Sequence, residues 1–184
     1  IHFVYQKSLE FAKALNANKE IVGPAALVHD LNYIFTEDLN PEAAEQETRQ
    51  LLLNENYSIQ EVETSSKTIA DANTGNRSSR DLSIESMALA DADTLFKSLP
   101  ITPIVFASKF ISQNNYSIEK LATKITEEQI PLLEKDIYFY SDVAKQKYMK
   151  WAKTNVELWS NVSESLADPD VKELLKISER NNVL

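Results

Sequence analysis

The spacing of apolar residues predicts a helix at the start of the chain. Apolar side chains recur there at helical spacing, at Phe3, Val4, Phe11, Ala12 and Leu15. His2 is expected near the N-terminal end of this helix. Because the first residue already falls inside a helical pattern and is not Met, we expect further residues upstream of Ile1.

A second helix is predicted over residues 21–31, which are mostly apolar. Pro24 is expected in its first turn, where the missing N–H of proline costs little. His29 and Asp30 follow the apolar run 25–28 and are therefore expected in the last turn.

Capping patterns predict the next two helices. Asn40 before Pro41 is typical of a cap followed by proline at the first helical position, and the helix is expected to run to about Asn54. Ser58 with Glu61 has the spacing of a capping box, which predicts the start of a fourth helix.

The rest of the chain alternates helical patterns with breaks. Residues 73–80 have the composition of a loop, 83–98 are helical and strongly apolar, and 99–103 contain two prolines that mark a break and a new start. A capping box is predicted at Thr126 with Gln129, and a long helix is expected from about Ser141 to Ala167. Its aromatic residues Tyr148, Trp151 and Trp159 are expected to pack against other helices, and Asp168 before Pro169 is expected to end it.

Composition favours an all-α fold. The chain has 184 residues, of which 43% are hydrophobic, enough for one good core. Only two glycines occur, so the material for hairpin turns, a P-loop or a dinucleotide fingerprint is missing. We expect a single all-helical domain over 1–184, with a helical-bundle core over about 1–98 and additional C-terminal helices over about 99–184.

Charge and cysteine content limit the function classes. A net charge of −9 disfavours binding to a nucleic-acid backbone, which depends on clustered Lys and Arg. No stretch is apolar enough for a membrane span, and no cysteine is present to form a disulfide or a thiolate site. We therefore expect a cytoplasmic protein without nucleic-acid or membrane partners, and long apolar C-terminal helices leave a homodimer open.

The adjacent pair His29 and Asp30 is the most informative chemical feature of this histidine-poor chain. His2 lies upstream of the pair and Asp93 lies downstream. Two imidazoles and two carboxylates form a mixed N/O ligand set that suits one divalent ion such as Mn, Fe, Co, Ni or Zn, with Mg also considered. Such an ion would lower the pKa of a bound water and polarise a phosphoryl oxygen.

The ordered set of His2, His29, Asp30 and Asp93 resembles the metal-binding motif of the HD superfamily of metal-dependent phosphohydrolases. Asp93 stands in the family's frame of an aspartate two residues before a leucine, and Asp91 is then expected to support the ligands from outside the site. The resemblance implies an HD-type helical bundle and hydrolysis of a nucleotide or another small phosphate ester.

Further residues are expected near such a site. The region 71–73 contains no histidine for a second metal, which favours a mononuclear site. Asp30 and Asp71 are the candidates for activating water, with Asp71 the weaker of the two. Candidate substrate-binding residues are Asn32, Tyr33, Asn73, Arg77, Arg80 and Lys97, where the positively charged side chains would bind phosphate.

Other interpretations remain open at the level of sequence. His2 could be a terminal surface histidine, and Arg77 and Arg80 could be solvated loop residues. The resemblance also includes hydratases of small non-phosphate substrates. A third alternative is a non-catalytic module that keeps the fold and binds a metal or a ligand for regulation.

Overall fold

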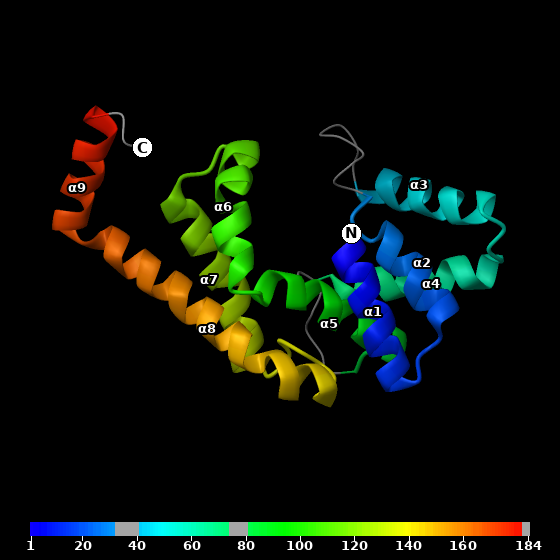
Figure 1. Cartoon of the computed structure of the whole chain (residues 1–184). Coiled ribbons are helices and arrows are strands. Elements are labelled where there is room, and N and C mark those ends of the chain that lie inside the picture. Colours follow the sequence, from blue (N-terminus) through cyan, green and yellow to red (C-terminus); the bar gives the residue numbers. More distant parts are fainter. Residues whose placement is uncertain (32–40, 74–80, 182–184) are drawn as a thin grey trace. The chain divides into compact units, whose positions relative to one another are not determined.

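A computed structural model describes residues 1–31, 41–73 and 81–181 of the chain, and Figure 1 shows the order of the elements. The described residues form helices and contain no strand, which confirms the all-α class. The helices are α1 (His2–Leu15), α2 (Lys19–Val28), α3 (Pro41–Asn54), α4 (Ile59–Ala72), α5 (Ile84–Ser98), α6 (Ile101–Asn114), α7 (Ile118–Glu134), α8 (Asp142–Ala167) and α9 (Pro169–Arg180). None of the described helices is both long enough and apolar enough to span a membrane.

The chain divides into two compact units. Unit 1 comprises Ile1–Lys97 and Ile137–Met149, and unit 2 comprises Ser98–Asp136 and Lys150–Leu184. The break after Lys97 lies close to residue 98, where we expected the helical-bundle core to give way to the additional C-terminal helices. The segment 137–149, by contrast, returns to unit 1, although the sequence places it far beyond that limit.

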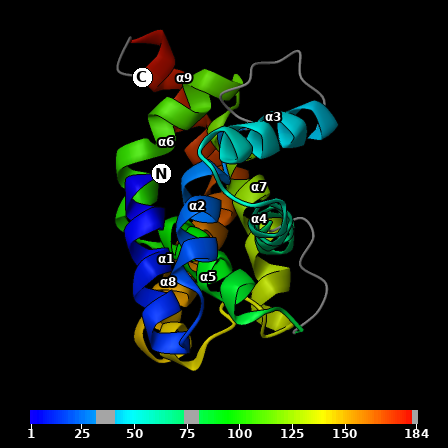
Figure 2. The same ribbon diagram turned by 90° about the vertical axis from the view of Figure 1, so that its right-hand side faces the viewer.

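Unit 1 is built on three helix pairs. α1 packs on α2, α2 packs on α4, and α3 packs on α4, which can be followed in Figures 1 and 2. α5 carries the most deeply buried run of side chains in the unit: Ala88, Leu89, Ala90, Ala92 and Leu95. These buried side chains fix α5 in the unit, and so also fix the position of its more exposed residues.

Local signals explain most of the helix ends. The Ser58 side chain accepts a hydrogen bond from the Glu61 N–H, and Glu61 bonds back to Ser58, which confirms the expected capping box of α4. Asn18 caps α2 by accepting from the Glu20 N–H. Because this cap starts α2 at Lys19, Pro24 lies inside the helix, and the expectation that it occupies the first turn is wrong.

Two other expectations about helix ends have different outcomes. The cap expected at Thr126 is wrong, because Ser117 already caps α7 and the Thr126 hydroxyl donates to the carbonyl of Ala122 inside the helix. Asn40, the expected cap of α3, lies outside the described residues.

A buried carboxylate joins the first turn of α8 to α5 within unit 1. Asp91 is fully buried, and its two oxygens accept from the Tyr140 N–H at 2.7 Å, the Ser141 N–H at 2.9 Å and the Ser141 hydroxyl at 2.5 Å. The Ser141 hydroxyl oxygen in turn accepts from the Ala144 N–H, one of the unpaired donors that begin a helix. Asp91 thus fixes the start of α8, which corrects the expectation that it supports the metal ligands.

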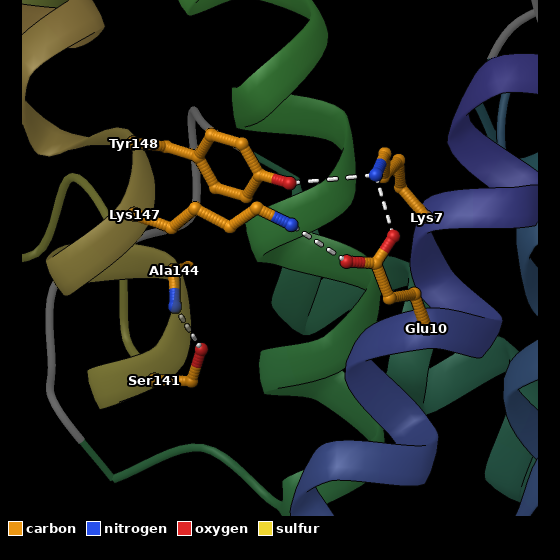
Figure 3. A network of polar contacts seen from close by, with 6 residues as sticks. All are labelled: Lys7, Glu10, Ser141, Ala144, Lys147 and Tyr148. Atoms are coloured by element: carbon orange, nitrogen blue, oxygen red, sulfur yellow. Dashed lines mark hydrogen bonds and ion pairs between the residues drawn. The ribbon is translucent and has the colours of Figure 1, made fainter.

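A polar network on the surface of unit 1 links α1 to α8 (Figure 3). Glu10 pairs with Lys7 at 2.5 Å and with Lys147 at 3.2 Å, and Lys7 lies 3.4 Å from the hydroxyl of Tyr148. The Tyr148 ring is buried and packs edge-on against Phe11. This apolar contact accompanies the charged contacts of Glu10 at the surface. This arrangement confirms that Tyr148 is used for helix packing.

Unit 2 has its own apolar core between α6, α7 and the later turns of α8. Leu121, Ala122 and Trp159 form its buried centre, with Ala107 and Ile111 of α6 packed against it. The burial of Trp159 confirms its expected use in helix packing. Asn155, also on α8, donates to the side chain of Gln129 on α7 at 3.2 Å in the same interior.

Candidate metal site

His29 is held by the carbonyl groups that end α2. His29 is the C-terminal cap of this helix. We expected it in the last turn, but that turn ends one residue earlier, at Val28. Its Nδ1 lies 2.8 Å from the carbonyl oxygen of Ala26. The last carbonyls of a helix have no partner within it, so one of them is available to a histidine three residues later.

This contact decides which ring nitrogen faces the rest of the site. A carbonyl oxygen can only accept, so Nδ1 carries the hydrogen, and in a neutral imidazole Nε2 then holds the lone pair. The His29 side chain is only 8% exposed. Nε2 is buried and makes no well-directed hydrogen bond within the described part of the chain.

Two carboxylates lie around this nitrogen. Oδ2 of Asp30 is 3.2 Å from Nε2, and Oδ1 of Asp93 is 4.0 Å from it. Asp30 follows α2 directly, whereas Asp93 comes from α5, so two helices distant in sequence meet at this point. Oxygen atoms facing a nitrogen lone pair are stable only if a proton or another cation lies between them, since a buried polar group otherwise loses free energy.

The electrostatics of the pair follow from this closeness. Burial lowers the pKa of His29, but the neighbouring carboxylate of Asp30 outweighs this effect and leaves the pKa above its usual value. Burial likewise raises the pKa of Asp30, but the interaction with His29, helped by the charge of Lys97, lowers it below its usual value. Asp30 is therefore ionised near neutral pH.

Lys97 completes the charged surroundings of Asp93. Its Nζ lies 3.0 Å from Oδ2 of Asp93, one turn earlier on α5. The oxygen bound by Lys97 is thus not the one that faces His29. Asp93 is 17% exposed and Lys97 is 38% exposed, so the pair lies at the edge of the site and is open to solvent.

His2 lies on the first turn of α1 and is exposed. Its neighbour Phe3 packs against Phe96 with ring centroids 5.8 Å apart, which brings this turn to the end of α5 that carries Lys97. The structure thus brings His29, Asp30, Asp93 and Lys97 together, with the turn of His2 beside them.

Asp71 and Asn73 lie elsewhere in unit 1. Asp71 accepts a hydrogen bond from the Ser86 hydroxyl at 3.0 Å. Ser86 precedes Asp93 by seven residues on the same helix, which is about 10 Å along its axis. Asn73 ends α4 as its cap and is exposed.

The other expected substrate-binding residues lie outside the described residues: Asn32, Tyr33, Arg77 and Arg80.

The carbonyl of Ala26, which orients His29, was not predicted from the sequence. The sequence could have predicted this contact, because a histidine at the C-terminal end of a helix lies three or four residues after carbonyls that lack partners.

Within residues 1–31, 41–73 and 81–181, no group of three or more His, Asp or Glu side chains has the geometry to hold a metal ion as they stand. A scan against protein-family models gives no match. Searches of curated proteins and of solved structures also give no match.

Proposed function

We propose that the chain is a metal-dependent phosphohydrolase that acts on a nucleotide or another small phosphate ester. The observation that carries the proposal is the orientation of His29. Its Nδ1 is bound to a backbone carbonyl while its buried Nε2 faces two carboxylates. A backbone carbonyl that binds one ring nitrogen and so fixes the tautomer is a usual partner of a histidine that binds a metal through its other nitrogen.

The donor types of this set suit one divalent ion, although the described side chains would have to shift to bind it. His29 would bind through Nε2, Asp30 and Asp93 would bind through carboxylate oxygens, and His2 is the fourth ligand proposed. When bound, the ion would lower the pKa of a water molecule and polarise a phosphoryl oxygen. This N/O set suits several divalent ions, so the metal with which the protein is tested has to be varied.

The residues of the chain have separate tasks in this proposal. His29 is held in one orientation by Ala26, so it does not have to be ordered when the site assembles. Asp30, ionised and 43% exposed, accepts a hydrogen bond from the attacking water and orients it toward phosphorus. Asp71 is the weaker candidate base, because it is bound to Ser86 two turns away from Asp93 along α5.

The test is phosphate release from a panel of nucleotides and small phosphate esters, with Mn, Co, Ni or Mg added. Native protein is compared with Asp30→Ala and Asp93→Ala, and Glu45→Ala is the control because Glu45 is an exposed carboxylate paired with Arg49 on α3. The proposal requires release that depends on both Asp30 and Asp93 and not on Glu45. Release that survives both substitutions would contradict it.

A second function uses the same geometry without a metal. The raised pKa of His29 favours an imidazolium beside Asp30 and Asp93, which would satisfy Nε2 by a proton. A non-catalytic regulatory module would then be the better description. Hydration of a small nitrile-like substrate is the remaining enzymatic alternative, and it would be recognised by turnover of such a compound with no release from phosphate esters.

A further inference from the structure

Lys97 pairs with one of the two carboxylates of the candidate metal site. Its Nζ binds Oδ2 of Asp93, while Oδ1 of the same carboxylate faces Nε2 of His29. The charge of Lys97 also acts on Asp30. The ammonium group therefore contacts Asp93 directly and acts on Asp30 through its charge alone.

The formal charges show what this ammonium does. With a neutral His29, the carboxylates of Asp30 and Asp93 contribute two negative charges and Lys97 contributes one positive charge, which leaves one negative charge. A divalent ion would bring the site to one positive charge. Without Lys97 the same groups and the ion would together be neutral, so among them Lys97 supplies the positive charge that would attract an anion.

We propose that Lys97 is an exchangeable counter-ion, which neutralises Asp93 while the metal site is empty and binds an anionic group of the substrate once a divalent ion is present. The inference rests on the proposed function and narrows its substrate to an anion such as a phosphate ester. A neutral substrate, as in the hydratase alternative, would gain nothing from this ammonium.

The side chain is suited to such an exchange. Lysine has a flexible four-carbon stem and three donors at its end, so it can leave one oxygen and bind another without movement of the helix. Its side chain is 38% exposed, so solvent reaches part of it. A divalent ion that withdraws charge from Asp93 would weaken the hold of this carboxylate on Lys97.

The test measures binding instead of turnover. Mn²⁺ alone is titrated calorimetrically into native protein, Lys97→Gln and Lys97→Arg, and inorganic phosphate is then titrated into each manganese-loaded protein. The matched control is Arg49→Gln, because Arg49 also pairs with an acidic residue one turn earlier, Glu45, at 3.3 Å.

Loss of the positive charge in Lys97→Gln should tighten Mn²⁺ binding by about three- to tenfold, because one repulsive charge near the ion is removed. The same variant should bind phosphate about tenfold more weakly or worse, since a charge-assisted hydrogen bond is lost. Lys97→Arg keeps the charge and should behave like native protein in both titrations, as should Arg49→Gln.

The outcomes separate this inference from the function on which it rests. If native protein binds no Mn²⁺, the metal site and the role of Lys97 both fail. If Mn²⁺ binds equally to native protein and Lys97→Gln, with equal phosphate affinity afterwards, the metal site stands and the inference about Lys97 is overturned. Weakened Mn²⁺ binding in Lys97→Gln would also overturn it, because the lysine would then be positioning Asp93.

Discussion

The Nδ1 atom of His29 lies 2.8 Å from the carbonyl oxygen of Ala26, so the end of α2 sets the direction of the imidazole. A single hydrogen bond thereby determines that Nε2 is the nitrogen presented to Asp30 and Asp93. The chemistry proposed for the chain depends on this relationship, because a histidine free to rotate would have no preferred partner.

The first prediction concerns pH and the metal-free protein. The pKa of His29 in the folded state lies above its usual value, so the pair with Asp30 stabilises the fold fully below the unfolded pKa of about 6.5. This contribution is lost as the pH rises through the folded pKa. His29→Gln should therefore lose more stability at pH 5.5 than at pH 8.5.

Urea unfolding with a chelator present measures this difference. The quantity to compare at each pH is the difference in unfolding free energy between native protein and His29→Gln. Other groups titrate in both proteins, so their effects cancel in this difference. An equal loss at the two pH values would mean that His29 has no raised pKa in the folded chain.

The second prediction concerns Asp91, which holds the start of α8. Asp91→Asn keeps the size of the side chain but replaces one acceptor oxygen by an NH₂ group that faces the donors of Tyr140 and Ser141. Since hydrogen bonds to a buried charged group contribute about 1.5–3 kcal/mol, the free energy of unfolding should fall by about 2–4 kcal/mol.

Asp142→Asn is the control for this substitution, because Asp142 is exposed in the first turn of the same helix. It should cost only about 0.3–1 kcal/mol, the value of a charge near a helix N-terminus. If the two variants are equally stable, Asp91 does not anchor α8.

The third prediction separates two members of the network in Figure 3. Glu10 is about half exposed, so Glu10→Gln should change the free energy of unfolding by less than about 1 kcal/mol, although two ion pairs are lost. Tyr148 is buried against Phe11, and Tyr148→Ala should cost about 3–5 kcal/mol. Chemical denaturation checks both values, and a larger effect for Glu10→Gln would reverse the assignment of packing and charge.

These contrasts also show what the sequence could and could not predict. Local signals were sufficient for the capping box of Ser58 and Glu61, because the atoms that form it lie three residues apart. The same kind of pattern gave a wrong prediction of a helix start at Thr126. Ser117 caps the start of α7, and the helix continues through Thr126.

Contacts between distant segments were harder to predict from the sequence. The resemblance to the HD motif implied that His29 and Asp93 should meet, and the structure places Nε2 of His29 4.0 Å from Oδ1 of Asp93. The return of residues 137–149 to unit 1 had no signal, because it depends on buried donors near Ser141 reaching Asp91 across about 50 positions. The family's frame separated Asp93 from Asp91, but nothing in the sequence indicated that Asp91 binds the donors of Tyr140 and Ser141.

The most direct measurement is calorimetric titration of Mn²⁺ into native protein, His29→Gln and Asp93→Asn, with unfolding curves to show that each variant is folded. The account predicts one ion per native chain and a loss of affinity of about a hundredfold or more in both variants. Native protein that binds no divalent ion, or variants that bind it as tightly as native protein, would contradict the proposed metal site.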